Sequence, residues 1–205
     1  MKALLIDTTK KQSNIVVIDN DDCKVIKMSD KIKHSEGLFL YLEKALLESC
    51  LNIQDFDYLS AIVGPGSFTG IRVGMSVILG LNRVINKKII PLNLFEIVAS
   101  EVENGVMLLG STMTSAYYGV IKSGKISEMG TIEKSQIKDR FGSDKIFILQ
   151  EELDLFDDSD YNTINNLDTL YSKALLRKIN SDDVGNFEPL YLQLSQAERN
   201  LNEKN

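Results

Sequence analysis

The sequence predicts an α/β protein in which a sheet starts with antiparallel strands, continues with parallel ones and is flanked by helices. Three short apolar segments near the N-terminus, separated by tight polar turns, indicate consecutive antiparallel strands at 4–6, 15–18 and 25–28. After them the apolar period changes, and helices alternate with strands. A strand–helix–strand crossover implies parallel pairing, so the first half of the chain follows the order β-β-β-α-β-α-β-α.

Local signals place the remaining elements. Ser35 can cap a helix over 36–50, the segment 59–63 is typical of a buried strand, and a glycine-rich loop precedes a second helix over 71–85. Further strands are predicted at 88–92, 106–109, 116–121, 125–132 and 146–149, further helices at 94–102 and 167–179, and an extended segment at 189–192. Because a new run of strands begins after Asn104-Gly105, we expect two lobes, 1–103 and a smaller 104–205.

Composition and charge exclude several classes of function. With 205 residues, of which 43% are apolar and 25% charged, the chain can bury a hydrophobic core. Acidic residues outnumber basic ones by 29 to 23, so the chain alone is a poor binder of nucleic-acid phosphates. Two cysteines, Cys23 and Cys50, make no disulfide framework or zinc spacing, and a single histidine excludes a metal site with two imidazoles. No apolar run reaches about 18 residues, so we expect a cytoplasmic protein without membrane contact.

The glycine loop at 64–70 is the most informative segment. Glycines between a strand and a helix permit close backbone approach, and the free N–H groups at the helix start can hold an anion. Arg72 would lie in the first helical turn, where a cation opposes the dipole, which indicates an anion or carboxylate partner. The loop lacks the lysine of a P-loop and the spacing of a dinucleotide fingerprint. Two interpretations therefore stay open: a turn that lets two backbones pack, or a weak anion site made by Gly64, Gly66, Ser67, Thr69, Gly70 and Arg72.

The two predicted helices of the first half carry more apolar surface than one sheet can bury. In the first, Leu40 and Leu47 fall inside the arc of its charged residues; in the second, the polar residues occupy only a narrow sector. Gly70 and Gly74, four residues apart, would let another helix approach closely. We expect a docking face for a partner, with candidate contacts at Leu40, Leu47, Ile71, Gly74, Met75 and Ile78. The alternative is burial beneath another layer of the same chain.

No arrangement of catalytic residues is evident. His34 stands just before a helix cap, which favours a turn or surface role over that of a base, and no G-x-S-x-G motif occurs. The acidic stretch with Asp154, Asp157, Asp158 and Asp160 lacks the glycine and glutamate of a calcium loop, so we expect a solvated loop. The turn Asp7-Thr8-Thr9 resembles the first phosphate turn of actin-like ATPases, but threonines replace the glycines that admit phosphate, which disfavours nucleotide hydrolysis by this chain alone.

Several of these segments together resemble the bacterial TsaB family, also called YeaZ. The resemblance rests on Ile6-Asp7-Thr8-Thr9, on His34-Ser35-Glu36 before a leucine-rich helix, and above all on the glycine loop continued by Ile71-Arg72-Val73-Gly74. Pro91 before the helix at 94, and Pro189-Leu190-Tyr191-Leu192, fit the same family. The paralogous TsaD shares the glycine-loop motif, but TsaD-like chains carry a histidine pair for metal, which a lone histidine cannot supply.

The resemblance implies a two-lobed actin/Hsp70/sugar-kinase-like (ASKHA) fold with ribonuclease H-like mixed sheets flanked by helices. It implies a non-catalytic scaffold role in placing the threonylcarbamoyl group on the adenosine next to the anticodon of certain tRNAs. In the family, TsaB pairs with TsaD through helices of the first lobe; TsaD holds metal and transfers the group, while TsaE supplies ATPase action. We therefore expect no cofactor on this chain alone, ATP or ADP and metal on the partner subunits, and tRNA contact only through the complex. For the isolated chain, a monomer and a homodimer both stay open.

The predicted second lobe departs from the family pattern. An Asp-Ala-Arg-like segment is usual where this chain has 111–118, and an arginine is usual where it has Gln193. Contacts of the second lobe should therefore not be carried over from the family. Two other functions stay open: a stand-alone ATP-dependent phosphotransferase or M22-like peptidase, and a stand-alone homodimer with an unrelated role.

Overall fold

The computed structural model describes residues 1–29, 34–156, 160–165, 167–181 and 184–193. The side chains of His34 and Ser35 lie outside the described part, as do Asp157 and Asp158 of the acidic stretch. The chain forms two compact units: Met1–Leu94 with Asp168–Leu190, and Phe95–Leu167 with the segment from Tyr191.

This division differs from the predicted boundary between 103 and 104. Helix α5 (Asp168–Ile179) returns to the first unit because its buried side, with Tyr171 and Leu175, packs on the first sheet. Phe95 belongs to the second unit because its ring packs where Gly119 leaves room in the second sheet. The order of elements along the sequence did not indicate that α5 joins the first unit or that the second unit begins at Phe95.

The first unit is built on a five-stranded mixed sheet with the order β3-β2-β1-β4-β5. Its first three strands are antiparallel, and β4 and β5 run parallel to β1, as the segment order predicted. The strands are β1 (Lys2–Asp7), β2 (Asn14–Asp19), β3 (Asp22–Lys27), β4 (Tyr58–Ile62) and β5 (Lys88–Leu92). The central strand β1 is buried from Ala3 to Asp7, as expected for a strand covered on both faces.

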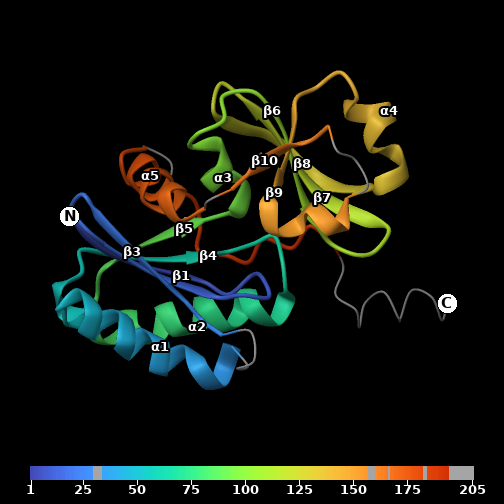
Figure 1. Cartoon of the computed structure of the whole chain (residues 1–205). Helices are drawn as coiled ribbons and strands as arrows, with labels where there is room; N and C mark the ends of the chain where they lie inside the picture. The colour runs from blue at the N-terminus through green and yellow to red at the C-terminus, as the bar shows by residue number, and fades with distance from the viewer. Residues whose placement is uncertain (30–33, 157–159, 166, 182–183, 194–205) are drawn as a thin grey trace. The chain divides into compact units, whose positions relative to one another are not determined.

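Helices cover both faces of this sheet. Helices α1 (His34–Ser49) and α2 (Phe68–Ile85) lie side by side on one face, where α1 contacts β2 and β3, and α2 contacts β1 and β4 (Figure 1). Helix α5 covers the other face and contacts β3 and β5. A short 3-10 turn, η1 (Ile53–Asp55), leads into β4.

Helix α2 begins earlier than predicted because Ser67 caps it. The Ser67 Oγ accepts a hydrogen bond from the Gly70 N–H at 3.2 Å. The helix ends at Asn86, whose left-handed φ of 48° is the conformation common after a helix C-terminus. Among the described residues, α2 is the one helix with the length and the apolar composition needed to cross a membrane. This is weak evidence for a membrane span, because a helix that covers a sheet passes the same test.

The second unit contains another five-stranded mixed sheet, with the order β10-β9-β6-β7-β8. An antiparallel meander forms β6 to β8, and β9 and β10 are parallel additions beside β6. The strands are β6 (Gly105–Gly110), β7 (Ser115–Lys122), β8 (Lys125–Glu133), β9 (Ile146–Leu149) and β10 (Asn162–Ile164). The prediction missed short elements with little periodicity: η1, η2 (Lys134–Gln136), α4 (Ile137–Phe141), η3 (Gln150–Leu155) and β10; it also made α3 (Leu94–Ala99) too long.

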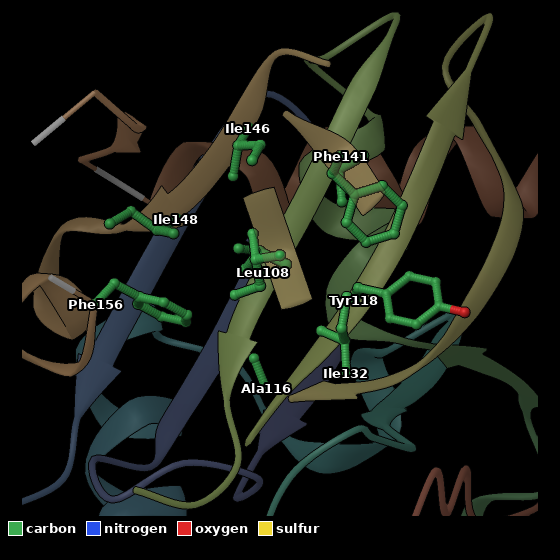
Figure 2. Packing of buried hydrophobic residues seen from close by; sticks show 10 residues of the cluster. Leu108, Ala116, Tyr118, Ile132, Phe141, Ile146, Ile148 and Phe156 are labelled. Atoms are coloured by element: carbon green, nitrogen blue, oxygen red, sulfur yellow. The ribbon is translucent and has the colours of Figure 1, made fainter. Parts of the chain in front are cut away.

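The core of the second unit lies between one face of this sheet and α4. Figure 2 shows Phe141 of α4 beside Tyr118 of β7, and their ring centroids are 5.2 Å apart. The same cluster contains Ile137, Phe156 and apolar residues from four strands: Val106, Leu108, Ala116, Ile132, Ile146 and Ile148. On the other face of β7, a Cβ on Gly119 would lie 2.6 Å from the Phe95 ring, so glycine is required for this packing.

Candidate functional site

The glycine loop and the turn after β1 pack into one structure in the first unit. The Ser67 N–H donates to the Thr9 carbonyl at 2.8 Å, and the Thr8 Oγ1 donates to the Gly70 carbonyl at 2.6 Å. Thr8 and Thr9 are buried, although both are polar. Two segments far apart in sequence therefore satisfy each other's hydrogen-bonding groups.

The loop's glycines are needed for this contact. A Cβ on Gly70 would lie 1.9 Å from the Thr8 carbonyl oxygen, and one on Gly66 would lie 2.5 Å from that of Thr9. At Gly64, whose φ is 134°, a Cβ would lie 2.4 Å from the Leu190 carbonyl oxygen. The geometry supports backbone packing, one of the two interpretations of the loop. The anion site stays a prediction for the exposed side chains of Ser67, Thr69 and Arg72.

Gly74 makes room for the same Thr8–Thr9 turn and not for a second helix. A Cβ on Gly74 would lie 2.5 Å from the Thr8 Oγ1. The prediction that Gly70 and Gly74 admit a partner helix is therefore wrong, because the chain's own Thr8 occupies that space.

A buried carboxylate lies at the end of β1. The Thr9 N–H and Oγ1 donate to Asp7 Oδ1 at 3.0 and 2.6 Å, and the Tyr171 hydroxyl donates to Asp7 Oδ2 at 2.7 Å. The Asn14 Nδ2 donates to the Tyr171 hydroxyl at 3.2 Å. Burial, and then the Asp7 charge, raise the pKa of Tyr171 well above its ordinary value, so its hydroxyl stays a donor.

This arrangement does not fit a nucleotide phosphate. Both Asp7 oxygens accept hydrogen bonds from neutral groups of the chain itself, and the glycine loop packs directly on Thr8 and Thr9. In the described residues, no three His, Cys, Asp or Glu side chains are placed to hold a metal ion together.

The outer surface of α1 carries large apolar side chains. Leu40 is 63% exposed and Leu47 is 73% exposed, as the periodicity predicted, while Leu38, Leu42 and Ala45 face the sheet. Phe39 is 61% exposed as well, which the prediction missed although it stands next to Leu40 in the same exposed arc. Leaving three such side chains in water forgoes their transfer free energy.

The predicted contacts on α2 require a correction. Ile71, Met75 and Ile78 are buried in the first unit, as is Gly74, because this side of α2 packs on β1 and β4. The exposed large apolar residues of α2 are instead Leu79 and Val84. Since α2 is apolar on nearly all sides, its period could not indicate which side faces the sheet. We call the exposed residues of the two helices the α1/α2 apolar surface: Phe39, Leu40, Leu47, Leu79 and Val84.

The α1/α2 apolar surface also contains an exposed glycine, Gly80. Gly80 is exposed in α2, one residue after Leu79, and a Cβ there would meet nothing within 4 Å. A backbone without a side chain beside exposed apolar groups permits close approach by another helix. This was the role that the sequence had suggested for Gly70 and Gly74.

Comparison with known protein families shows to which family the chain belongs. The model of the TsaD family, tRNA N6-adenosine threonylcarbamoyltransferase, matches residues 29–148. The chain belongs to this family. Within it, the chain is of the TsaB (YeaZ) type, as its sequence motifs indicated.

The TsaB type rests on one similar relative and on two similar solved structures. The chain is 24% identical to the Haemophilus influenzae tRNA threonylcarbamoyladenosine biosynthesis protein TsaB over 60% of its own length and 55% of that protein. It is 27% identical to a Sulfurisphaera tokodaii tRNA N6-adenosine threonylcarbamoyltransferase, over 45% of this chain and 33% of that protein. The aligned region thus spans about half or less of these relatives.

The structural likeness is more extensive. YeaZ from Pseudomonas aeruginosa matches with a TM-score of 0.71 over 93% of this chain and 99% of YeaZ, at 15% identity. A second Pseudomonas aeruginosa structure, described as similar to peptidase YEAZ, has a TM-score of 0.72. These matches confirm the predicted α/β fold, in which helices flank mixed sheets.

The two places where this TsaB-type chain departs from the family pattern lie together in the second unit. The Gln193 Nε2 donates to the Ser115 Oγ at 3.3 Å, which joins the segment after the first unit's last residues to the start of β7. No local pattern in the sequence indicates that these two segments meet, because they are far apart in the chain.

Proposed function

We propose that this chain is a non-catalytic scaffold subunit required for threonylcarbamoylation of the adenosine next to the anticodon of tRNA. It acts by pairing with the catalytic paralogue TsaD. The observation that carries the proposal is the α1/α2 apolar surface, where five large apolar side chains lie exposed on two adjacent helices. Surfaces of this kind mark protein interfaces. The name of the Haemophilus influenzae relative, a tRNA threonylcarbamoyladenosine biosynthesis protein, supports the pathway.

The buried turn after β1 supports a role without nucleotide chemistry. Asp7 is fully buried and bound by Thr9 and Tyr171, so its carboxylate is engaged inside the chain. ATP or ADP and the metal then belong to TsaD and TsaE, the second of which supplies ATPase action. The net charge of −6 agrees with tRNA being held mainly by the other subunits.

The same surface offers a place for self-association. An isolated chain pairs two copies through α1 and α2 when TsaD is absent, because an apolar patch can be self-complementary about a two-fold axis. The complex acts in the cytoplasm, where tRNA is modified.

The test compares two matched substitutions in one unit. Leu47→Glu places a charge on the α1/α2 apolar surface, whereas Leu176→Glu makes the same change at a 40% exposed leucine of α5, on the other face of the sheet. Each variant is co-expressed with TsaD from the same organism, and co-purification, the melting temperature and the modified-adenosine content of tRNA are measured. We expect Leu47→Glu to lose TsaD and tRNA modification while melting like the wild type, and Leu176→Glu to keep both.

The opposite result would exclude this docking surface. If Leu47→Glu still co-purifies with TsaD, the pairing face lies elsewhere. Calorimetry with ATP tests the stand-alone phosphotransferase: micromolar binding and turnover by the isolated chain would contradict a scaffold role.

A further inference from the structure

A polar pocket lies in the second unit, at the end of its edge strand. Its volume is about 230 Å³, and it is lined by Ser115, Thr131, Ile132, Glu133, Gln136 and Gln193. Ser115 opens β7 and Glu133 ends β8, and the two are paired directly opposite each other in the sheet. Small-molecule sites usually measure about 300–1,000 Å³ and are largely apolar. This pocket therefore suits one polar side-chain group better than a nucleotide.

The lining presents one carboxylate, two hydroxyls, two amides and no positive charge. Ser115 is only 8% exposed, and its Oγ lies 2.7 Å from the Thr112 Oγ1 while accepting from the Gln193 Nε2. The Gln193 amide thus uses one of its two N–H groups inside the protein, and its Oε1 has no hydrogen bond in the described part of the chain. Thr131 and Gln136 add a hydroxyl and a second amide.

The only charge among the lining residues is negative. Glu133 forms no ion pair with another described residue. Its neighbour Lys134 is engaged elsewhere, because its Nζ donates to the Leu155 carbonyl at 2.6 Å and lies 5.1 Å from the centre of the Phe156 ring. An exposed carboxylate alone is ordinary, but here it stands in a concavity with amide and hydroxyl oxygens and no cation.

The position of the pocket indicates how a ligand would arrive. Strand β8 is the last strand of its sheet, and most of its residues are exposed. An edge strand offers unpaired N–H and C=O groups to an extended peptide, while pockets beside the edge select its side chains.

We propose that this pocket binds the guanidinium group of an arginine in an extended segment of a protein partner that pairs along β8. A guanidinium has five donors in a planar fork, which matches a carboxylate flanked by amide and hydroxyl oxygens. An anionic ligand is disfavoured because the lining contains no lysine, arginine or histidine. The α1/α2 apolar surface lies in the other unit, so this site is separate from the proposed TsaD-docking surface.

The first test titrates N-acetyl-arginine amide into the ¹⁵N-labelled full chain and follows backbone amide shifts. Its neutral isostere N-acetyl-citrulline amide is the matched control. We expect saturable shifts confined to the pocket residues with a Kd of about 1–10 mM, and binding about fivefold weaker for citrulline, because a hydrogen bond to a charged group exceeds a neutral one by about 1 kcal/mol.

Three variants test whether the pocket residues bind the arginine probe. Glu133→Gln removes the pocket's charge and should weaken binding by about fivefold, whereas Glu103→Gln makes the same change elsewhere in this unit and should have no effect. Gln193→Arg places a guanidinium of the chain itself beside Ser115 and should abolish binding of the probe.

A peptide arm tests the strand pairing. A short extended peptide with a central arginine should shift β8 amides in addition to the pocket, and its citrulline counterpart should not. Equal affinity for arginine and citrulline, unchanged binding to Glu133→Gln, or no saturable shift up to about 50 mM would each overturn the proposal. Peptide shifts that leave the β8 amides unmoved would refute the strand pairing.

Discussion

Replacing Gly70 by alanine should destabilise the first unit, although alanine is the better helix former. The added Cβ would lie 1.9 Å from the Thr8 carbonyl oxygen, so the turn after β1 or helix α2 must move. Overpacking of this kind costs about 1–3 kcal/mol. The movement also strains the hydrogen bond from Thr8 Oγ1 to the Gly70 carbonyl, which is worth about 0.5–1.5 kcal/mol.

The helix propensity of alanine offsets part of that cost. Glycine inside a helix is less favourable than alanine by about 0.5–1 kcal/mol. The net expectation for Gly70→Ala is a loss of about 1–3 kcal/mol in the free energy of unfolding. At this chain length that corresponds to a melting temperature lower by roughly 2–4 °C per kcal/mol.

Gly80→Ala is the internal control, since it makes the same substitution in the same helix. A Cβ there meets nothing within 4 Å, so only the propensity gain of about 0.5–1 kcal/mol remains and the variant should be more stable than the wild type. Urea unfolding followed by circular dichroism measures both variants. If Gly70→Ala is neutral or stabilising like Gly80→Ala, the glycine loop does not hold the Thr8–Thr9 turn as described.

Three further predictions follow from the packing of single side chains. Tyr171→Phe removes a donor to the buried Asp7 carboxylate and should lower the unfolding free energy by about 1–3 kcal/mol in urea titrations; an unchanged midpoint would contradict the hydrogen bond. The folded state raises the pKa of Tyr171, so the unfolded chain releases that proton first and wild-type stability should fall as pH rises above about 10. Melting curves between pH 8 and 11 should show less of this fall in Tyr171→Phe, and equal slopes would count against it. Phe141→Ala should cost about 3–5 kcal/mol and raise amide hydrogen exchange in β6 to β8; a loss below about 1 kcal/mol would mean that α4 does not complete the second core.

The elements with strong local signals were predictable from the sequence. β-branched runs such as 15–18 and the long apolar helix after Ser67 carry a period or a cap within a few residues, and the structure places β2 and α2 there. Elements of three to six residues, such as β10 and α4, lack enough length for a period and form only where the second sheet packs against them. The return of α5 to the first unit depends on contacts across the chain, which no local window contains.

The residues of the candidate site also divide into those that the sequence predicted and those that it did not. Exposure of Leu40 and Leu47 follows from the periodicity of one amphipathic helix and could be predicted. Helix α2 is apolar on nearly every side, so its sequence could not distinguish the side with Ile71 and Ile78, which the sheet buries, from the side with Leu79, which stays exposed.

The sequence by itself determined the order of strands and helices, the family motifs and the surplus of apolar helix surface. Each of these features depends only on residues that are close together in the chain. Only the tertiary structure decided what the glycines approach, what binds Asp7 and where Gln193 meets Ser115. Those contacts join residues that are distant in the chain, and a distance in space is set by the packing of the whole unit and not by any local pattern.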